Sequence, residues 1–233
     1  MINDGLWPQT LVPIMIIHEF DDLTALIQQL GFLPLLDNPV AGFSAEEMAS
    51  IECRYQRYND GSWSWPLWDW KGPAVQNTPC VYGKFFGGRA GFVSLEWWPD
   101  LMNYRRGTHP YPAENSVERA ILDILELNGA MITRELRKAC GFTGPKMRSR
   151  FDNYVTRLQM ECRIVTEDFV YPKDKQGERY GFGWALLNTP ENTVGRAACH
   201  CDRTPQESLE LILKHFSEIL PHANADAIRK IIC

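Results

Sequence analysis

Hydrophobic residues recur at helical spacing near both ends of the chain. One face of the stretch 18–30 carries Phe20, Leu23, Ile27 and Leu30, and Gly31 follows as a stop. Near the other end, Thr204 and Glu207 have the spacing of a capping box around Pro205. The apolar stripe after this box consists of Leu209, Ile212, Leu213, Phe216 and Leu220. The pattern predicts two amphipathic helices, each with one face buried against the rest of the protein.

Three further helices are predicted in the middle of the chain. The first extends from a cap at Asn115 or Ser116 to a stop at Gly129, and the second from a cap at Thr133 to Gly141. The third is the longest and carries a core face made of Phe151, Tyr154, Val155 and Leu158. Pro145 stands in its first turn, where a missing N–H costs nothing.

Two strands are expected directly after the third helix. They cover 164–171 and 179–187, and the polar residues 173–177 form the turn between them. The third helix is also rich in lysine and arginine. The order helix, short helix, basic helix and two-stranded wing is typical of the winged helix, a variant of the helix-turn-helix motif.

Tryptophan, proline and glycine are concentrated between residues 52 and 112. Five of the eight tryptophans fall within 63–97, and we expect the aromatic residues there on turns and short elements. The Trp98-Pro99 and His109-Pro110 bonds mark element boundaries, and 107–115 is the best linker candidate.

The chain as a whole is therefore expected to be an α+β, mostly helical protein with tandem winged-helix-like units and a small β wing. Residues 1–112 form an N-terminal helical, tryptophan-rich, winged-helix-like region in this interpretation. Residues 113–190 form a winged-helix module, and residues 191–233 form a C-terminal loop and a docking helix.

Charge is unevenly distributed along the chain. The stretch from Arg134 to Arg179 holds eleven Lys and Arg and seven Asp and Glu, so it carries +4, whereas the whole chain carries −5. This asymmetry indicates a polyanion as the partner of one module. Because phosphate contacts dominate the affinity for nucleic acid, any such binding is expected to be local to this stretch.

Cysteine usage and short motifs exclude several other classes of protein. Seven cysteines without repeated spacing favour reduced thiols in a cytoplasmic protein. Three adjacent residues, Cys199, His200 and Cys201, cannot easily supply three corners of a tetrahedral metal site, and no CxxC pair accompanies them. The sequence lacks a GxxxxGK[ST] loop and a membrane-length apolar run. We expect no metal, no cofactor and no membrane association.

Three stretches resemble a known protein family. They are LGFLPLLDNPVAGFS at 30–44, WPLWDWKGP with YGKFFGGRAGFVSLEWWPDLMNYRR at 65–106, and the module at 116–190. These residues resemble the winged-helix family that includes the AlkZ-type bacterial DNA glycosylases, and more closely a short AlkZ-related branch of it. The resemblance covers most of the chain, and its second stretch is the most specific. It implies a concave architecture of several winged helices that cradles duplex DNA.

The resemblance also implies where a catalytic motif would stand. The glycosylases of the family carry Gln-x-Gln or Gln-x-Asp shortly after a Leu-Gly pair, which here is residues 30–31. One register places Pro34 and Leu36 at the two polar positions, and a shift by one residue places Leu35 and Asp37 there. Neither register supplies the glutamine, and the chain is shorter than the glycosylases. The resemblance therefore implies a shared fold and DNA association but not base excision.

Basic side chains of the third helix and the wing are the candidates for contact with DNA. They could reach phosphates or guanine edges, and they are Lys146, Arg148, Arg150, Arg157, Lys173, Lys175 and Arg179. The alternative is a solvated helix face whose arginines pair with Asp152 and Glu161. Acidic residues beside the wing count against DNA, and winged helices also serve as protein-binding modules.

Aromatic and acidic residues provide two further candidate sets. The tryptophans Trp65, Trp68, Trp70 and Trp97 could form a stacking pocket for a base, or they could fill the core. Asp37, Glu96 and Asp100 are acid–base candidates, although Glu96 and Asp100 also suit the charge of a helix terminus.

The function predicted from these features is non-catalytic association with double-stranded DNA, linked to DNA damage or regulation. A divergent glycosylase-like hydrolase that uses Asp37 or Glu96 is one alternative. The other is a protein-interaction scaffold without DNA binding, in which case the partner is a protein.

Overall fold

A computed structural model describes residues 15–144, 146–177, 179 and 181–233, so Pro145 lies outside the described residues. The helices are α1 (Phe20–Leu30), α2 (Ala45–Met48), α3 (Pro66–Asn77), α4 (Trp98–Thr108), α5 (Val117–Asn128), α6 (Thr133–Ala139), α7 (Met147–Met160), α8 (Pro190–Thr193), α9 (Pro205–Ile219) and α10 (Ala225–Ile232). The strands are β1 (Phe32–Pro34), β2 (Gln56–Arg57), β3 (Trp63–Ser64), β4 (Cys80–Phe86), β5 (Arg89–Ser94), β6 (Met131–Ile132), β7 (Val165–Val170) and β8 (Trp184–Asn188). The protein is α+β and mostly helical, as predicted.

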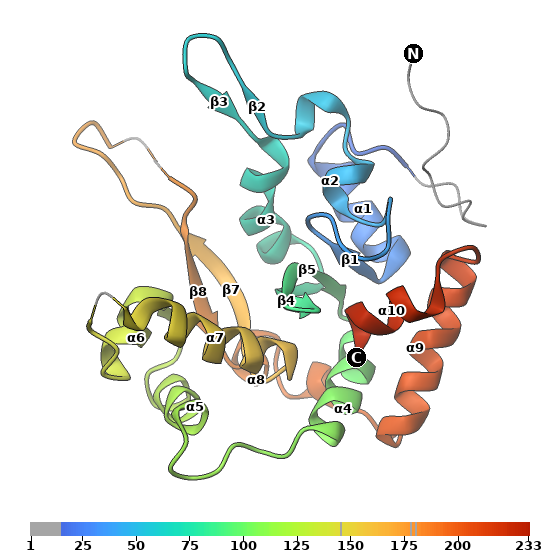
Figure 1. The fold of residues 1–233 in the computed structure, drawn as a ribbon, viewed down its shortest axis with the longest axis vertical. Coiled ribbons are helices and arrows are strands. Elements are labelled where there is room, and N and C mark those ends of the chain that lie inside the picture. Colours follow the sequence, from blue (N-terminus) through green and yellow to red (C-terminus); the bar gives the residue numbers. More distant parts are fainter. Residues whose placement is uncertain (1–14, 145, 178, 180) are drawn as a thin grey trace.

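One antiparallel sheet of six strands extends through the molecule, in the order β1-β5-β4-β7-β8-β6 (Figure 1). The first three strands come from the N-terminal half of the chain and the other three from residues 131–188. The junction between the halves is the pairing of Tyr82 on β4 with Thr166 on β7. A separate hairpin, β2–β3, projects from the same side of the molecule as the β7–β8 hairpin (Figure 1).

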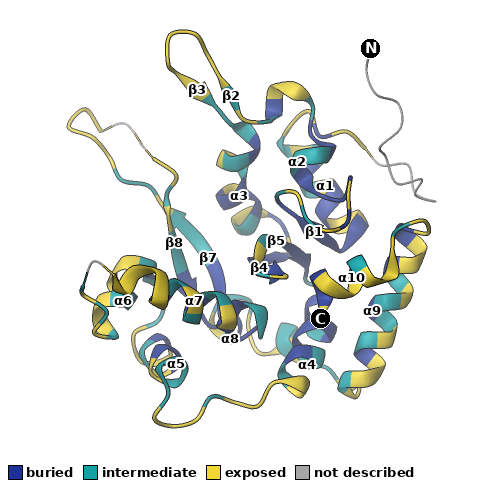
Figure 2. Ribbon diagram, in the orientation of Figure 1, coloured by how far each residue is buried: buried dark blue, intermediate teal, exposed yellow. Residues whose placement is uncertain are grey.

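Two hydrophobic clusters lie beneath the surface (Figure 2). The larger cluster combines side chains from the N-terminal half with side chains of α9 and α10. The smaller one combines α5, α6, α7 and β8 through residues such as Ile121, Leu136, Phe151 and Leu187. Of the helices in the described part of the chain, none has the length and apolar character needed to cross a membrane.

The tryptophan-rich region contains two regular helices, contrary to the expectation of turns and short elements. Pro66 and Pro99 occupy the first turns of α3 and α4, where no N–H is needed, so each proline favours the start of a helix. The expected boundaries at residues 98–99 and 109–110 are confirmed, since α4 begins at Trp98 and ends at Thr108. The Gly87-Gly88 pair forms the β4–β5 turn, and both glycines have a positive φ.

The predicted helix caps are confirmed at two of three positions. The Ser116 hydroxyl accepts a hydrogen bond from the Arg119 backbone N–H, and Thr204 and Glu207 form the complete capping box of α9. Thr133 does not cap α6. It is the first helical residue, and its hydroxyl donates to the Ala185 carbonyl across the sheet at 3.0 Å.

The second strand of the module begins at Trp184 rather than at residue 179. Gly181 and Gly183 have φ angles of 73° and 74°, a left-handed conformation that interrupts an extended strand. Only an isolated bridge between Lys173 and Arg179 continues the hairpin within its described residues. The tail also contains more structure than predicted, because α8 and the 3-10 turn η2 (Ala197–Cys199) lie in the expected loop and α10 follows α9.

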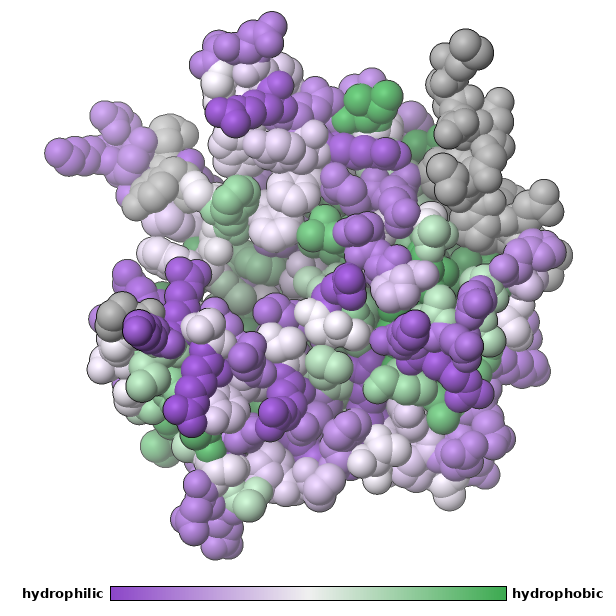
Figure 3. Space-filling model, in the orientation of Figure 1, coloured by the Kyte–Doolittle hydropathy of each residue, from purple (hydrophilic) through white to green (hydrophobic). Residues whose placement is uncertain are grey.

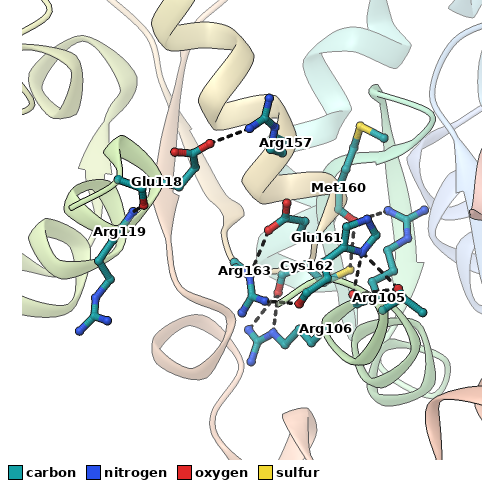
Figure 4. Close-up of polar contacts among 12 residues, drawn as sticks. Arg105, Arg106, Glu118, Arg119, Arg157, Met160, Glu161, Cys162 and Arg163 are labelled. Atoms are coloured by element: carbon teal, nitrogen blue, oxygen red, sulfur yellow. Dashed lines mark hydrogen bonds and ion pairs between the residues drawn. The ribbon is translucent and has the colours of Figure 1, made fainter. Parts of the chain in front are cut away.

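Arginine side chains connect the tail, the sheet and the end of α7 (Figure 4). The buried guanidinium of Arg105 donates to the carbonyls of Phe85, Met160 and Ile232 at 2.5–3.1 Å. The neighbouring Arg106 donates to the carbonyl of Cys162, which adopts a φ of 55°. Three segments far apart in the sequence are therefore held at one point by charge-assisted hydrogen bonds.

Candidate nucleic-acid interface

Helix α7 has one buried face and one exposed, basic face. Phe151, Val155 and Leu158 are buried in the smaller cluster. All four basic candidates of this helix are exposed, namely Lys146, Arg148, Arg150 and Arg157. Figure 2 shows exposed residues along the outer side of both α6 and α7. The periodicity of α7 thus directs its cations to solvent, because its apolar residues pack against α5, α6 and β8.

A recess of about 140 Å³ lies between α6, the N-terminal turns of α7 and β8. It is lined by Thr133, Arg134, Arg137, Arg148, Asp152 and Trp184. Arg134 lies over the indole of Trp184, 4.7 Å from the ring centroid. Arg148 Nε lies 3.8 Å from Asp152 Oδ2, and the arginine side chain is 80% exposed, so this ion pair is weak.

The recess adds three residues that sequence reasoning did not select. Arg134 and Arg137 were counted in the net charge of the stretch, and Trp184 was assigned to a strand. The predicted helix-turn-helix order could have pointed to Arg134 and Arg137, because such an order brings the start of α6 beside the start of α7. The cationic surface therefore includes α6 as well as α7.

The remaining basic candidates differ in how far their charge is compensated. Arg157 donates to Glu118 at 2.8 Å, so an acidic partner neutralises it. On the β7–β8 hairpin, Lys173 and Lys175 are exposed, and the Arg179 guanidinium lies 5.4 Å from the Tyr171 ring centroid. Exposed cations with mobile side chains retain most of their attraction for a polyanion.

The four selected tryptophans lie in three different surroundings. Trp65 and Trp68 stack on each other with ring centroids 4.7 Å apart. Trp70 contacts Phe20, and Trp97 stacks on His215 at 4.1 Å. The Trp65 and Trp68 pair lies on α3 below the two projecting hairpins, whereas Trp97 lies where α4 meets α9.

Lys71 is fully buried between α3 and β7. Its ammonium donates to the Trp68 carbonyl at 2.9 Å and to the Tyr171 hydroxyl at 3.1 Å. The rings of Trp68 and Phe169 lie 4.1 Å and 4.4 Å from it. Burial lowers the pKa of Lys71 to about 7, while the nearby Asp69 carboxylate acts in the opposite direction.

The acidic candidates lie outside this basic surface. Asp37 is exposed in the loop after β1, and Glu96 is exposed just before α4. Asp100 is buried and accepts hydrogen bonds from Ser208 at 2.7 Å and from Arg203 at 3.1 Å. These contacts fix α9 to α4 and account for the position of Asp100 without a catalytic role.

No group of metal-binding side chains is present among the residues that the structure describes. His200 pairs with Asp202 at 2.8 Å, and the thiol of Cys201 lies 3.5 Å from Asp100. The side chains of His200 and Cys201 thus contact different neighbours.

Comparison with protein families gives a match over residues 17–233 to the family described as AlkZ related. The chain belongs to the AlkZ-related family. No curated protein and no solved structure matches it. The AlkZ-related match covers both halves of the six-stranded sheet, so the module around α7 and the tryptophan-rich region belong to one family unit.

Within this AlkZ-related chain, the positions that correspond to the glycosylase motif lie at the edge of the sheet. Pro34 is the last residue of β1, and Leu35 is buried. Leu36 is half-buried, and Asp37 is the first exposed residue of the loop. Residues 34–37 thus form the end of an edge strand and the start of a loop, and Asp37 supplies their one polar side chain.

Proposed function

We propose that this AlkZ-related protein binds duplex DNA through α7 and the β7–β8 hairpin, which act as the recognition helix and wing of a winged-helix module. The observation that carries the proposal is the exposure of Lys146, Arg148 and Arg150 at the N-terminal end of α7. These side chains are free to approach phosphates or guanine edges once the helix lies in a major groove.

The topology of residues 117–188 supports the proposal. The order is α5, β6, α6, α7, β7 and β8, and β8 lies between β6 and β7 in the sheet. This is the arrangement expected of a helix-turn-helix with a β wing. The recess between α6 and α7 brings Arg134, Arg137 and Arg148 together, which extends the positive surface beyond one helix.

Acidic side chains moderate this surface without cancelling it. Asp152 faces Arg148 at 3.8 Å, and Glu118 neutralises Arg157. The proposed contacts are therefore few, and we expect a modest affinity whose salt dependence is set by their number, since each neutralised phosphate releases counterions.

The proposal includes binding without base excision. Pro34 and Leu36 stand at the motif positions in one register, and the buried Leu35 stands before the exposed Asp37 in the other. Neither pair provides the two polar side chains that would polarise a glycosidic bond and orient water. A single solvated carboxylate is a weak base for that purpose.

Fluorescence anisotropy with a labelled duplex at several salt concentrations tests the proposal. We expect Arg148→Ala and Arg150→Ala each to weaken binding and to reduce the slope of log K against log salt by roughly one. Lys214→Ala on α9 is the matched control, because it removes an exposed cation far from α7 and is expected to leave the affinity unchanged.

Incubation with a duplex containing an alkylated base, followed by detection of the released base, measures excision directly. Release of the free base by the wild-type protein would contradict the non-catalytic part of the proposal. Equal affinities of the wild type and both arginine variants would exclude α7 as the recognition helix. If the protein does not bind the duplex at low salt, binding of a protein partner is the remaining candidate function.

A further inference from the structure

A row of aromatic rings connects the bases of the two projecting hairpins. Tyr55 lies 6.3 Å from Trp63, and Trp63 lies 5.5 Å from Phe182, measured between ring centroids. Phe182 continues the row to Trp68 at 5.8 Å, and Trp68 stacks on Trp65. The row therefore joins β2–β3 and α3, which are adjacent in the sequence, to the distant β7–β8 hairpin.

The rings of this row differ in how accessible they are. One face of Trp68 is covered by the Lys71 ammonium and its ring also stacks on Trp65, so little of it is open. Trp63 is 41% exposed and Phe182 is 54% exposed. Other large aromatic side chains of the protein, such as Trp98 and Phe32, are completely buried. The hairpin rings are thus held in place by neighbours and still present open surface.

Basic side chains lie on the same two hairpins as these exposed rings. Residues 54–64 and 171–183 together contain five Lys and Arg and three Asp and Glu in the sequence. Arg57 on β2 and Lys173 and Lys175 on the β7–β8 hairpin are exposed. Figure 3 shows strongly hydrophilic tips on both hairpins and a paler, less polar surface between their bases. Planar rings on the same hairpins as cations match a base and its phosphates.

We propose that the exposed parts of the Trp63 and Phe182 rings form a stacking platform for unpaired nucleobases of a strand that continues from the duplex on α7. This inference rests on the proposed function, since the β7–β8 hairpin carries both Phe182 and the wing cations. Stacking of one base on an aromatic side chain contributes about 1–3 kcal/mol and tolerates any sequence. An apolar peptide would fit the rings but would gain nothing from the lysines and arginines of the two hairpins.

The test compares a blunt duplex with the same duplex extended by a short single-stranded thymidine overhang. We expect the wild-type protein to bind the overhang probe at least about fivefold more tightly, as stacking of one base predicts. The double variant Trp63→Leu and Phe182→Leu is expected to lose this gain and to keep its affinity for the blunt duplex. Circular dichroism verifies that the variant is folded.

Two further variants separate this proposal from the duplex-binding proposal. Arg148→Ala is expected to weaken binding of both probes equally, whereas Tyr111→Leu, which removes an exposed aromatic ring outside the row, is expected to weaken neither. If the blunt duplex does not bind, single-stranded oligothymidine replaces both probes, and quenching of tryptophan fluorescence that is lost in the double variant supports the platform. An overhang preference that is absent in the wild type or retained in the double variant overturns it.

Discussion

Among single residues, Lys71 is completely buried, and its amino group forms no ion pair with a carboxylate of the described residues. The ion pairs between described residues do not include it, and its ammonium faces the Trp68 carbonyl, the Tyr171 hydroxyl and aromatic rings. Asp69 on the same helix is exposed, and Asp168 on β7 accepts a hydrogen bond from the Phe169 backbone N–H. Desolvation therefore dominates and favours the neutral amine.

This arrangement predicts a specific dependence of stability on pH. Between a folded pKa of about 7 and an ordinary value of 10.5, the unfolded chain binds a proton at Lys71 that the folded protein does not bind. The free energy of unfolding therefore rises with pH across this window, by about 1 kcal/mol per pH unit. Lys71→Met is expected to remove this contribution, and urea unfolding between pH 7 and 9 measures it.

Lys214→Met provides the control, because its ammonium is solvated in the folded protein as well as in the unfolded chain. The comparison stops at pH 9 because the burial of Cys80, whose pKa is raised to about 12, acts in the opposite direction at higher pH. Parallel stability curves for the wild type and Lys71→Met between pH 7 and 9 would show that the lysine stays protonated in its aromatic surroundings.

Sequence patterns could not reveal the role of Lys71 or of the recess on α6. A lysine between Trp70 and Gly72 has no periodic signature, and its burial depends on the strand β7, which lies about a hundred residues later. Arg134 was visible as a charge, but its position over Trp184 requires the pairing of β6 with β8. In contrast, the exposure of Arg150 follows from the apolar face of its own helix, because Phe151, Val155 and Leu158 point to another side.

At the level of elements, Gly31 ends α1 and also permits α4 to begin beside it. Its φ is 72°, and a Cβ atom there would overlap the indole of Trp97. This indole cannot move aside easily, because it stacks on His215. The end of α1 and the packing of α4 therefore both depend on the absence of a side chain at Gly31.

We expect Gly31→Ala to be much more destabilising than an alanine at another helix stop. Gly129→Ala is the matched control, since its φ is 73° and no atom lies within 4 Å of the added Cβ. A positive φ is unfavourable for alanine in both variants, with ψ at −34° in Gly31 and −153° in Gly129, and the overlap with Trp97 adds about 1–3 kcal/mol only in the first. Thermal unfolding of the two variants measures the difference, and equal losses would contradict the steric argument.

Individual elements were predictable where one short pattern determined them. The capping box at Thr204 and the stripe of α9 identify that helix from the sequence alone. Helix α10 spans only eight residues, and α3 contains glycine and proline, so neither produced a clear signal. Strand β8 was placed too early because the left-handed glycines at 181 and 183 interrupt a stretch with strand-like composition.

At the level of the whole molecule, Arg105 links segments that no local pattern relates. Its guanidinium satisfies carbonyls of β4, of the end of α7 and of the end of α10. The six-stranded sheet could not be predicted from local patterns either, since the pairing of Tyr82 with Thr166 spans 84 residues of sequence. Long-range pairing depends on the packing of both halves, which periodicity does not describe.

Replacement of Arg105 is expected to destabilise the protein globally. Arg105→Met keeps the apolar stem but leaves several buried carbonyls without a donor, at about 1–3 kcal/mol for each that stays unsatisfied. We expect a loss on the order of 3–5 kcal/mol in urea unfolding, with all parts of the protein unfolding together. Arg229→Met, on the exposed side of α10, is expected to have little effect. A comparably small loss for Arg105→Met would show that water replaces the guanidinium.

The composition of the two hydrophobic clusters has a consequence for the order in which the chain can fold during synthesis. The smaller cluster draws its buried residues from Ile121 to Leu187, so it is complete well before translation ends. The larger cluster begins at Ile17 but includes Ile228, Ile231 and Ile232. The segment that begins at Ile17 is therefore synthesised before the smaller cluster but closes its core after it. Until Ile228, Ile231 and Ile232 emerge, its apolar surface depends on chaperones or on its own partial packing for protection.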